Sequence, residues 1–152
     1  MNTFAKLEDL RALIGEPLGT GEWIEVSQAR IQQFADATDD QQWIHIDVER
    51  AKTGPFKTTI AHGFLTLSLV PQLIATTYRI ADEVMGVNYG SNRVRFPTPV
   101  PSGSRLRAHI KLIKFEPLDG GAQLTTEITI ELEGSPKPAC VAEFVSRSYT
   151  QR

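Results

Sequence analysis

Asp40 and His45 are the two residues of this sequence best suited to proton transfer, because they stand close together in one polar segment. His45 is the one histidine of three that closely follows an aspartate in a stretch, DDQQWIHIDVERAKTGPF from 39 to 56, that we expect to be mostly irregular. Imidazole exchanges protons near neutral pH, and a carboxylate can orient it or a water beside it. Taken alone, Asp40 could simply end a helix and His45 could be a partly buried loop residue. Their proximity favours an acid-base pair.

Gly63 is a candidate for stabilising negative charge. It opens an apolar segment that we expect to be helical, and a glycine there lets a ligand carbonyl approach N–H groups that have no partner within the helix. An oxyanion could be held at such a position. His62, directly before it, is more simply interpreted as a capping or packing residue.

The other reactive side chains have ordinary interpretations. His109 lies on the polar face of an expected strand, where we expect it to be solvated. Cys140 has only apolar neighbours and is interpreted as a small core residue. As the single cysteine, it can form no internal disulfide and no structural zinc site, so we expect no metal.

The first half of the chain has helical patterns. Residues 7 to 14 predict one or two amphipathic turns that end at Gly15 and Pro17, and residues 21 to 26 a weak strand. Ser27 is a good N-cap for a helix that ends near Asp39, and residues 48 to 52 predict a further turn.

Residues 58 to 78 contain no Lys, Arg, Asp or Glu, which raises the question of a membrane span. Too many polar side chains interrupt this segment, and no positive cluster flanks it, so we predict a helix buried in protein. The helix should run from Gly63 to Tyr78, and Pro71 should either kink it or be tolerated locally. It is apolar nearly all round and should be covered on several sides.

The second half of the chain predicts strands. Apolar and polar residues alternate at 105–112 and 123–132, and 88–96 and 139–149 add two more strands. Turn residues at 101–104, 118–121 and 133–136 predict antiparallel connections. We predict an α+β fold in which one antiparallel sheet of about five strands curls around the long helix. Its open edges favour a homodimer formed through edge strands.

Composition bounds the class of protein. With 152 residues, 41% hydrophobic and 22% charged, the chain is expected to form one domain, 1–152, and not a disordered segment. Charged residues within the N-terminal apolar pattern, together with the missing small-residue cleavage site, argue against a secretory signal. We expect a cytoplasmic protein without a membrane association.

Positive charge is concentrated between Val84 and Phe115, where six cations occur without an acid: Arg93, Arg95, Arg105, Arg107, Lys111 and Lys114. This stretch is either a solvated face of the sheet or a landing surface for an anionic ligand. Nucleic acid is disfavoured as the ligand, because the rest of the chain is acidic and no RNA- or DNA-binding motif is present. A phosphorylated small molecule fits better.

Five segments together resemble the MaoC-type hydratases, in the branch that includes nodulation protein N: DDQQWIHID (39–47), ERA (49–51), GPF (54–56), IAHGFLTLSL (60–69) and VRFPTPVPSGSRLR (94–107). The resemblance runs from about Trp23 to the C-terminus. It implies a hot-dog fold, a homodimer, and an (R)-specific enoyl-CoA hydratase, which is a lyase. Such an enzyme needs no cofactor, because the coenzyme A thioester is the substrate.

The resemblance also implies roles for individual residues. Asp40 and His45 match the catalytic pair, and Gly63 matches the glycine whose N–H faces the thioester oxygen. Gln42 and Trp43 replace the Asn and Pro usual in this loop, which leaves the pair intact. Because Trp43 and Phe56 flank this loop and Phe64 begins the apolar segment, we expect at least one of them to limit the depth of the acyl chain, although all three could instead be core packing. We also expect substrate contacts from His62, and from Arg93 and Arg95 to the coenzyme A phosphates.

Three alternatives stay open. A hot-dog thioesterase would hydrolyse the same thioester, and a non-catalytic protein could bind acyl-CoA without turnover. A nucleic-acid-binding module would use the basic stretch, although it lacks stacking aromatic residues.

Overall fold

The alternating residues of the second half form the central strands of a sheet. The structure is a computed structural model that describes residues 1–150. Strands β6 (Ser104–Leu118) and β7 (Gly121–Leu132) pair antiparallel, with Ala108 opposite Ile130 and Ile110 opposite Ile128. These four side chains are buried on one face, because residues two apart along a strand point to the same side.

The sheet has six strands, in the order β2-β6-β7-β8-β5, with β3 also paired to β6. The additional strands are β2 (Pro17–Thr20), β3 (Ile24–Val26), β5 (Met85–Arg95) and β8 (Cys140–Tyr149). Turns at 118–121 and 133–136 join neighbouring antiparallel strands, as predicted. The turn at 101–104 also joins strands that run in opposite directions, β5 and β6, but these two strands are not neighbours in the sheet.

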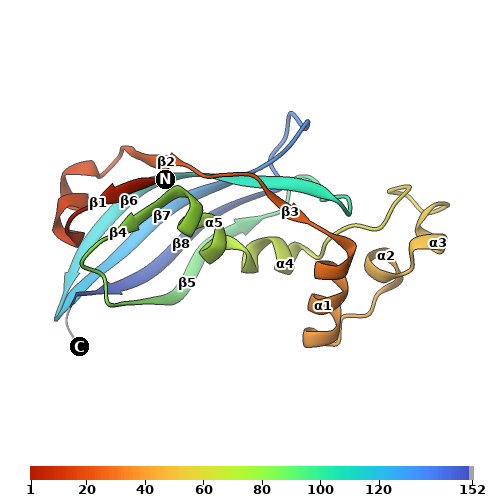
Figure 1. Ribbon diagram of the computed structural model, residues 1–152, viewed down its shortest axis with the longest axis horizontal. Helices are drawn as coiled ribbons and strands as arrows, with labels where there is room; N and C mark the ends of the chain where they lie inside the picture. The colour runs from red at the N-terminus through yellow and green to blue at the C-terminus, as the bar shows by residue number, and fades with distance from the viewer. Residues whose placement is uncertain (151–152) are drawn as a thin grey trace.

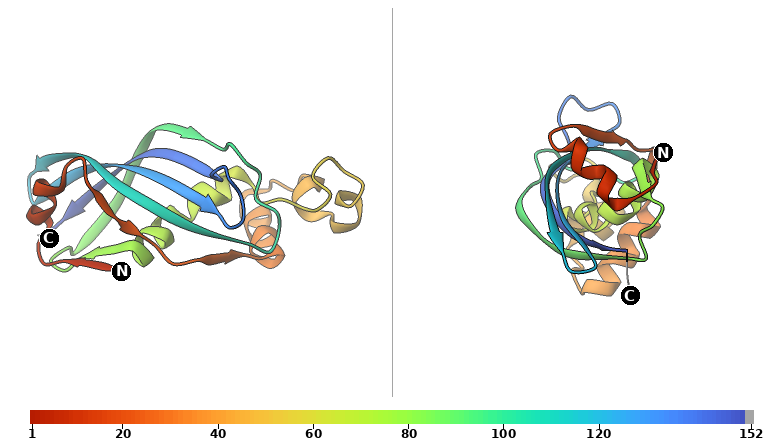
Figure 2. Two further views of the ribbon diagram at one scale, coloured as in Figure 1. Left: turned by 90° about the horizontal axis from the view of Figure 1, so that it is seen from above. Right: turned by 90° about the vertical axis from the view of Figure 1, so that its left-hand side faces the viewer.

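Two consecutive helices replace the single long one that the sequence predicts. They are α4 (Gly63–Ser68) and α5 (Val70–Thr77), with Leu69 between them. Pro71 stands in the first turn of α5, where its missing N–H costs nothing, so the irregularity falls just before the proline. Figure 2 shows the sheet curling around this helical segment, which confirms the predicted α+β architecture.

The helices are less enclosed than their composition suggests. Leu65, Val70 and Leu73 are buried against the sheet, whereas Phe64 and Gln72 belong to an exposed stripe. The expectation of covering on several sides is therefore wrong for the single chain. Among residues 1–150, we find no helix that combines the length and the apolar character needed to span a membrane.

A separate two-stranded parallel sheet lies at the C-terminal end of the helical segment. β4 (Tyr78–Ile80) follows α5 directly and pairs with β1 (Asn2–Phe4). The predicted N-terminal turns form a 3₁₀ helix, η1 (Leu7–Leu13).

Three short helices project beyond the sheet at the other end (Figure 1). They are α1 (Gln28–Thr38), α2 (Trp43–Ile46) and α3 (Val48–Ala51). Ser27 caps α1 as predicted, by accepting a hydrogen bond from the Arg30 N–H. Asp39 ends it in a left-handed conformation, at φ 59°. His45 is thus on a helical turn and not in an irregular loop.

Acidic residues of β7 and the turn that follows it neutralise part of the basic stretch. Arg107 Nε lies 2.7 Å from Glu131 Oε2, and Arg105 pairs with Glu133. His109 also contacts Glu131, at 2.6 Å, so the expectation that it is merely solvated is wrong. These hydrogen bonds lower the pKa of Glu131. The pairing of Arg105 and Arg107 favours the first interpretation, a solvated face of the sheet, at these two positions.

Because Asp39 has a left-handed backbone conformation, substitutions at this position should change the free energy of unfolding in opposite ways. Replacing Asp39 with Gly should preserve or raise the free energy of unfolding, since glycine adopts positive φ without strain. Asp39→Val should lower it by about 1–2 kcal/mol, because a β-branched side chain clashes in this conformation. Urea unfolding of both variants measures the difference, and equal stabilities would contradict this description of the helix end.

Candidate active site

His45 is held by two hydrogen bonds from distant parts of the chain. Its Nδ1 lies 2.7 Å from the carbonyl oxygen of Ile60, and its own carbonyl oxygen accepts a hydrogen bond from Gln28 Nε2 at 2.8 Å. A carbonyl oxygen only accepts, so Nδ1 must carry the proton. In the neutral ring, Nε2 is then the free base, which is the tautomer needed for proton transfer.

Burial favours that neutral ring. His45 is 6% exposed, and burial lowers its pKa from the ordinary value. The hydrogen bond to Ile60 and the charge of Asp40 act in the opposite direction, while His62 lowers the pKa further. The net result is a histidine that is mostly uncharged at neutral pH.

Asp40 lies beside His45 but is open to solvent. Its side chain is 50% exposed, and it follows the left-handed Asp39 that turns the chain away from α1. One carboxylate oxygen of Asp40, one ring nitrogen of His45 and one of His62 all lie within 4.8 Å of one another. A single water can hydrogen-bond to two groups at such a separation, since each bond spans about 2.8 Å. The structure therefore brings the predicted pair together.

The same three residues are a poor metal site. The rings of His45 and His62 lie face to face, with centroids 3.7 Å apart and an angle of 22° between their planes. Imidazole binds a metal through a lone pair in the ring plane, so two stacked rings do not direct their lone pairs to one ion. We therefore do not assign these residues as metal ligands.

A cleft of about 270 Å³ opens beside His45. It is lined by His45, Phe56, Ile60, Ala61, Gly63, Thr66, Phe96, Thr98, Pro99, Val100 and Ala139. Gly63 is the first residue of α4, where the N–H has no acceptor within the helix. The ring of Phe96 lies so close to Gly63 that an added Cβ would approach it to 2.9 Å. Any larger residue at position 63 would therefore require the Phe96 ring to move.

Residues 9–131 match the model of the MaoC like domain family. The chain belongs to this family. The match covers most of the chain and agrees with the resemblance in the sequence segments. It also agrees with the hot-dog arrangement of sheet and helices.

Known proteins support the same assignment. The chain is 51% identical to "3-hydroxyacyl-thioester dehydratase Z" of Mycobacterium tuberculosis over 148 residues, which are 97% of this chain and 98% of that protein. It is 44% identical to "Nodulation protein N" of Rhizobium leguminosarum bv. viciae over 144 residues, 92% of this chain and 89% of that protein. The fold is similar to that of the unliganded R-hydratase PhaJ1 from Pseudomonas aeruginosa, with a TM-score of 0.69, 22% identity, and coverage of 91% and 83%. This MaoC-like protein is a lyase of the hydratase/dehydratase class, as the sequence indicated.

Of the three aromatic residues expected at the acyl chain, only Phe56 lines the cleft of the MaoC-like domain. Trp43 instead packs under the Arg50 guanidinium, at 4.2 Å, and against Gly54, so the geometry favours a packing role for it. Phe64 is 68% exposed and contacts Phe96 edge to face.

The two expected coenzyme A contacts, Arg93 and Arg95, do not line this cleft. They border a separate hollow on β5, β7 and β8, whose other charged residues are Glu127 and Glu143. The structure therefore brings Asp40, His45, His62 and Gly63 together, whereas the two arginines lie outside the cleft, on the strand that leads to its lining residue Phe96.

Two contributors to the site carry no clear signal in the sequence. Gln28 sits at the start of α1, where its amide joins the His45 carbonyl to the Thr59 hydroxyl, at 2.8 and 2.6 Å. Phe96 lies within one of the segments that resemble the family, but nothing in its own spacing distinguishes it from a core residue. Both act through contacts between residues far apart in sequence.

The lowered pKa of His45 predicts a pH dependence of stability. As the pH falls, the unfolded chain protonates His45 first, at its ordinary pKa of about 6.5, so folding then requires loss of that proton. The stability that His45 contributes is complete above about pH 6.5 and declines as the pH falls toward the native pKa. His45→Asn retains a donor where Nδ1 stood but cannot titrate.

Chemical denaturation at neutral pH and at about pH 5 measures this effect. We expect the wild type to lose more free energy of unfolding on acidification than His45→Asn. His109→Asn is the matched control. Because it retains His45, its free energy of unfolding should fall on acidification more than that of His45→Asn. Equal losses in the wild type and His45→Asn would contradict the buried neutral histidine.

Proposed function

We propose that this MaoC-like protein is an (R)-specific hydratase that adds water to trans-2-enoyl-CoA to give (3R)-hydroxyacyl-CoA, and catalyses the reverse dehydration. One observation carries the proposal: a neutral His45 with a free Nε2 stands beside the Asp40 carboxylate, at a cleft that also contains Gly63. The relative named as a dehydratase of 3-hydroxyacyl thioesters supports the same substrate class. The cytoplasmic location remains a prediction.

The hydration step needs a base, a proton donor and a stabilised enolate. Water held by Asp40 and His45 attacks C3 of the enoyl thioester, and its proton passes to His45 Nε2. The electron pair of the C2–C3 double bond moves toward the thioester carbonyl. The imidazolium then returns the proton to C2, so one water is added and the enzyme is regenerated. Dehydration follows the same steps in reverse.

Gly63 supplies the third requirement in this proposal. The charge that builds up on the thioester oxygen would be held by the Gly63 N–H, which has no acceptor within α4. The apolar wall around Thr66, Val100 and Ala139 is suited to an acyl chain. Phe56 is the aromatic residue that we propose to contact that chain.

This chemistry requires no metal and no redox cofactor, because the proton transfers use side chains alone. We propose that Arg93 and Arg95 contact the coenzyme A phosphates, as exposed cations on the strand that leads to Phe96.

The acid-base pair predicts large losses of rate in single variants. Asp40→Asn and His45→Asn should each lower the kcat of crotonyl-CoA hydration about 10²- to 10⁴-fold, the usual contribution of a general acid or base. Because both residues act on one water, the double variant should be scarcely slower than either single variant. Loss of the enoyl absorbance measures the rate.

Two controls sharpen the experiment. Asp36→Asn changes an exposed carboxylate on α1, and His109→Asn changes a histidine on the outer sheet face; both should keep wild-type kcat. Release of free thiol from a saturated acyl-CoA would indicate a thioesterase, and binding without turnover a non-catalytic protein. Near wild-type hydration by Asp40→Asn would refute the role of the pair.

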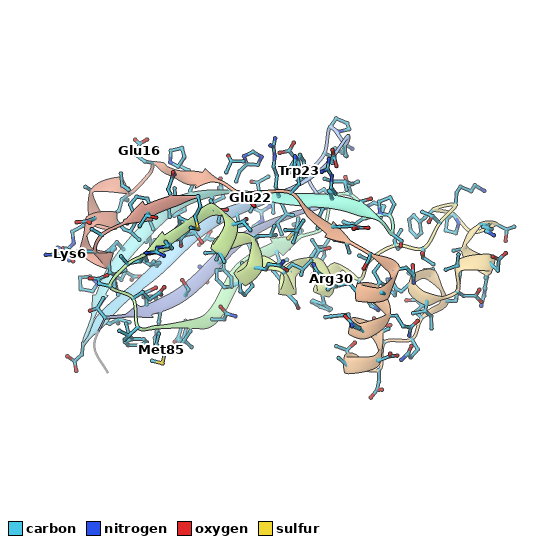
Figure 3. The ribbon with its side chains drawn as sticks, in the orientation of Figure 1. Lys6, Glu16, Glu22, Trp23, Arg30 and Met85 are labelled. Atoms are coloured by element: carbon cyan, nitrogen blue, oxygen red, sulfur yellow. The ribbon has the colours of Figure 1, made fainter. Side chains whose placement is uncertain are left out.

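We also propose a homodimer formed along β5. This strand is an outer strand of the sheet, and its residues Met85, Val87 and Tyr89 are 52, 41 and 60% exposed. Figure 3 places Met85 at this edge of the molecule. A hollow of about 400 Å³ lies between β5 and the exposed stripe of α5. A second copy paired along β5 would occupy the free edge and cover this apolar surface.

Charge introduced on β5 should therefore dissociate the protein. In sedimentation at micromolar concentration, we expect the wild type at twice the chain mass of 16.9 kDa and Val87→Glu shifted toward the monomer. Val48→Glu places the same charge at a similarly exposed valine on α3 and should stay dimeric. A monomeric wild type would contradict this proposal.

A further inference from the structure

His62 has a more specific place in the site than its position before α4 suggests. Although it is the N-cap residue of α4, its side chain makes no capping hydrogen bond. The imidazole is instead 2% exposed and stacks on the ring of His45 at 3.7 Å, with the Phe34 ring 4.9 Å away. Capping therefore does not explain this histidine.

The hydrogen bonds of His62 fix its tautomer. Its Nε2 lies 3.0 Å from the backbone carbonyl oxygen of Asp40, so Nε2 must carry the proton and donate. In the neutral ring, Nδ1 then bears a lone pair, and within residues 1–150 this buried atom has no hydrogen-bond partner. A buried acceptor without a partner destabilises the fold, because it has lost its hydrogen bonds to water and gained none in exchange.

That cost argues against packing as the whole explanation. An apolar side chain beside Phe34 and His45 would pack there without an unpartnered nitrogen. What the histidine adds is the Nε2 donor toward the backbone of Asp40. Its other polar atom contributes nothing to stability in the free enzyme.

His62 is also the residue that joins the three parts of the site. It holds Asp40 through the backbone carbonyl, with the nearer carboxylate oxygen 4.0 Å from Nε2. It covers one face of the His45 ring and is bonded directly to Gly63. Asp40 and His45 come from different segments, so their relative placement depends on such a contact.

We propose that His62 is a positioning residue of the hydratase reaction: its Nε2–H and its ring face hold Asp40 and His45 in the arrangement that shares one water. This proposal rests on the proposed function. Small displacements of groups that act together reduce rates strongly, by as much as about 10²-fold for 1 Å. The ionisable groups facing His62 are His45 and Asp40, and the proximity of His62 also contributes to the lowered pKa of His45.

Three substitutions separate the contacts of His62. In His62→Gln the amide nitrogen stands where Nε2 stood, so the bond to Asp40 is retained without the ring. In His62→Asn the amide nitrogen stands near the position of Nδ1 and cannot reach the Asp40 carbonyl. His62→Phe keeps a stacked ring and removes the unpartnered Nδ1, but it loses the donor to the Asp40 carbonyl. Urea unfolding of each variant shows whether it is folded under the assay conditions.

We expect His62→Phe and His62→Asn to lower the kcat of crotonyl-CoA hydration about 10- to 100-fold with little change in KM, and His62→Gln to keep most of the wild-type kcat. The amide pair is the matched comparison, because Gln and Asn carry the same amide group and differ by one methylene, which moves the position of the donor. Equal kcat values for the wild type, Phe and Asn variants would overturn the proposal and leave His62 as core packing.

Proton NMR titration supplies a measurement that does not need activity. The chain has three histidines, so the His62 and His109 variants assign the remaining ring signals to His45. In His62→Phe the titration midpoint of His45 should rise, since His62 no longer lowers its pKa. An unchanged midpoint would contradict control of His45 by His62. If the wild type hydrates no enoyl thioester, the proposed function fails, and the midpoint still decides whether His62 governs His45.

Discussion

The hydrogen bond from His45 Nδ1 to the carbonyl oxygen of Ile60 is the interaction on which the chemistry of the site depends. It fixes the tautomer, because a carbonyl can only accept, and so leaves Nε2 of the neutral ring as the free base. The surrounding burial lowers the pKa of the ring and keeps it neutral. Without this bond, either nitrogen could carry the proton and the pair would lose its defined geometry.

The connection between β5 and β6 holds Ile60, whose carbonyl oxygen accepts that hydrogen bond, in place. Ile60 forms an isolated bridge to Pro101, and the Ala61 N–H donates to the Val100 carbonyl at 2.8 Å. These contacts fasten the segment before α4 to the connection between β5 and β6. The helices α1 to α3 project beyond the sheet (Figure 1). The hydrogen bonds of His45 with Ile60 and Gln28 therefore hold its side chain at the cleft.

Sequence patterns predicted the elements whose stability is local or periodic. The strands β6 and β7 follow from alternation, and α1 follows from its Ser27 cap and apolar stripe. β2 was missed because four residues that contain Pro17 and a glycine show no alternation. The proximity of Asp40 and His45 was predictable from spacing and confirmed by the structure. The contacts of His45 with Ile60 and His62 were not, because they join residues brought together only by the fold.

In the proposed mechanism, one Asp40–His45 pair binds the water and transfers its proton on one side of the substrate. Hydration of crotonyl-CoA in D₂O, followed by NMR and chiral analysis of the product, tests this directly. We expect (3R)-hydroxybutyryl-CoA with one deuterium at C2, added to the same face as the hydroxyl group. Addition to opposite faces, or a (3S) product, would contradict it.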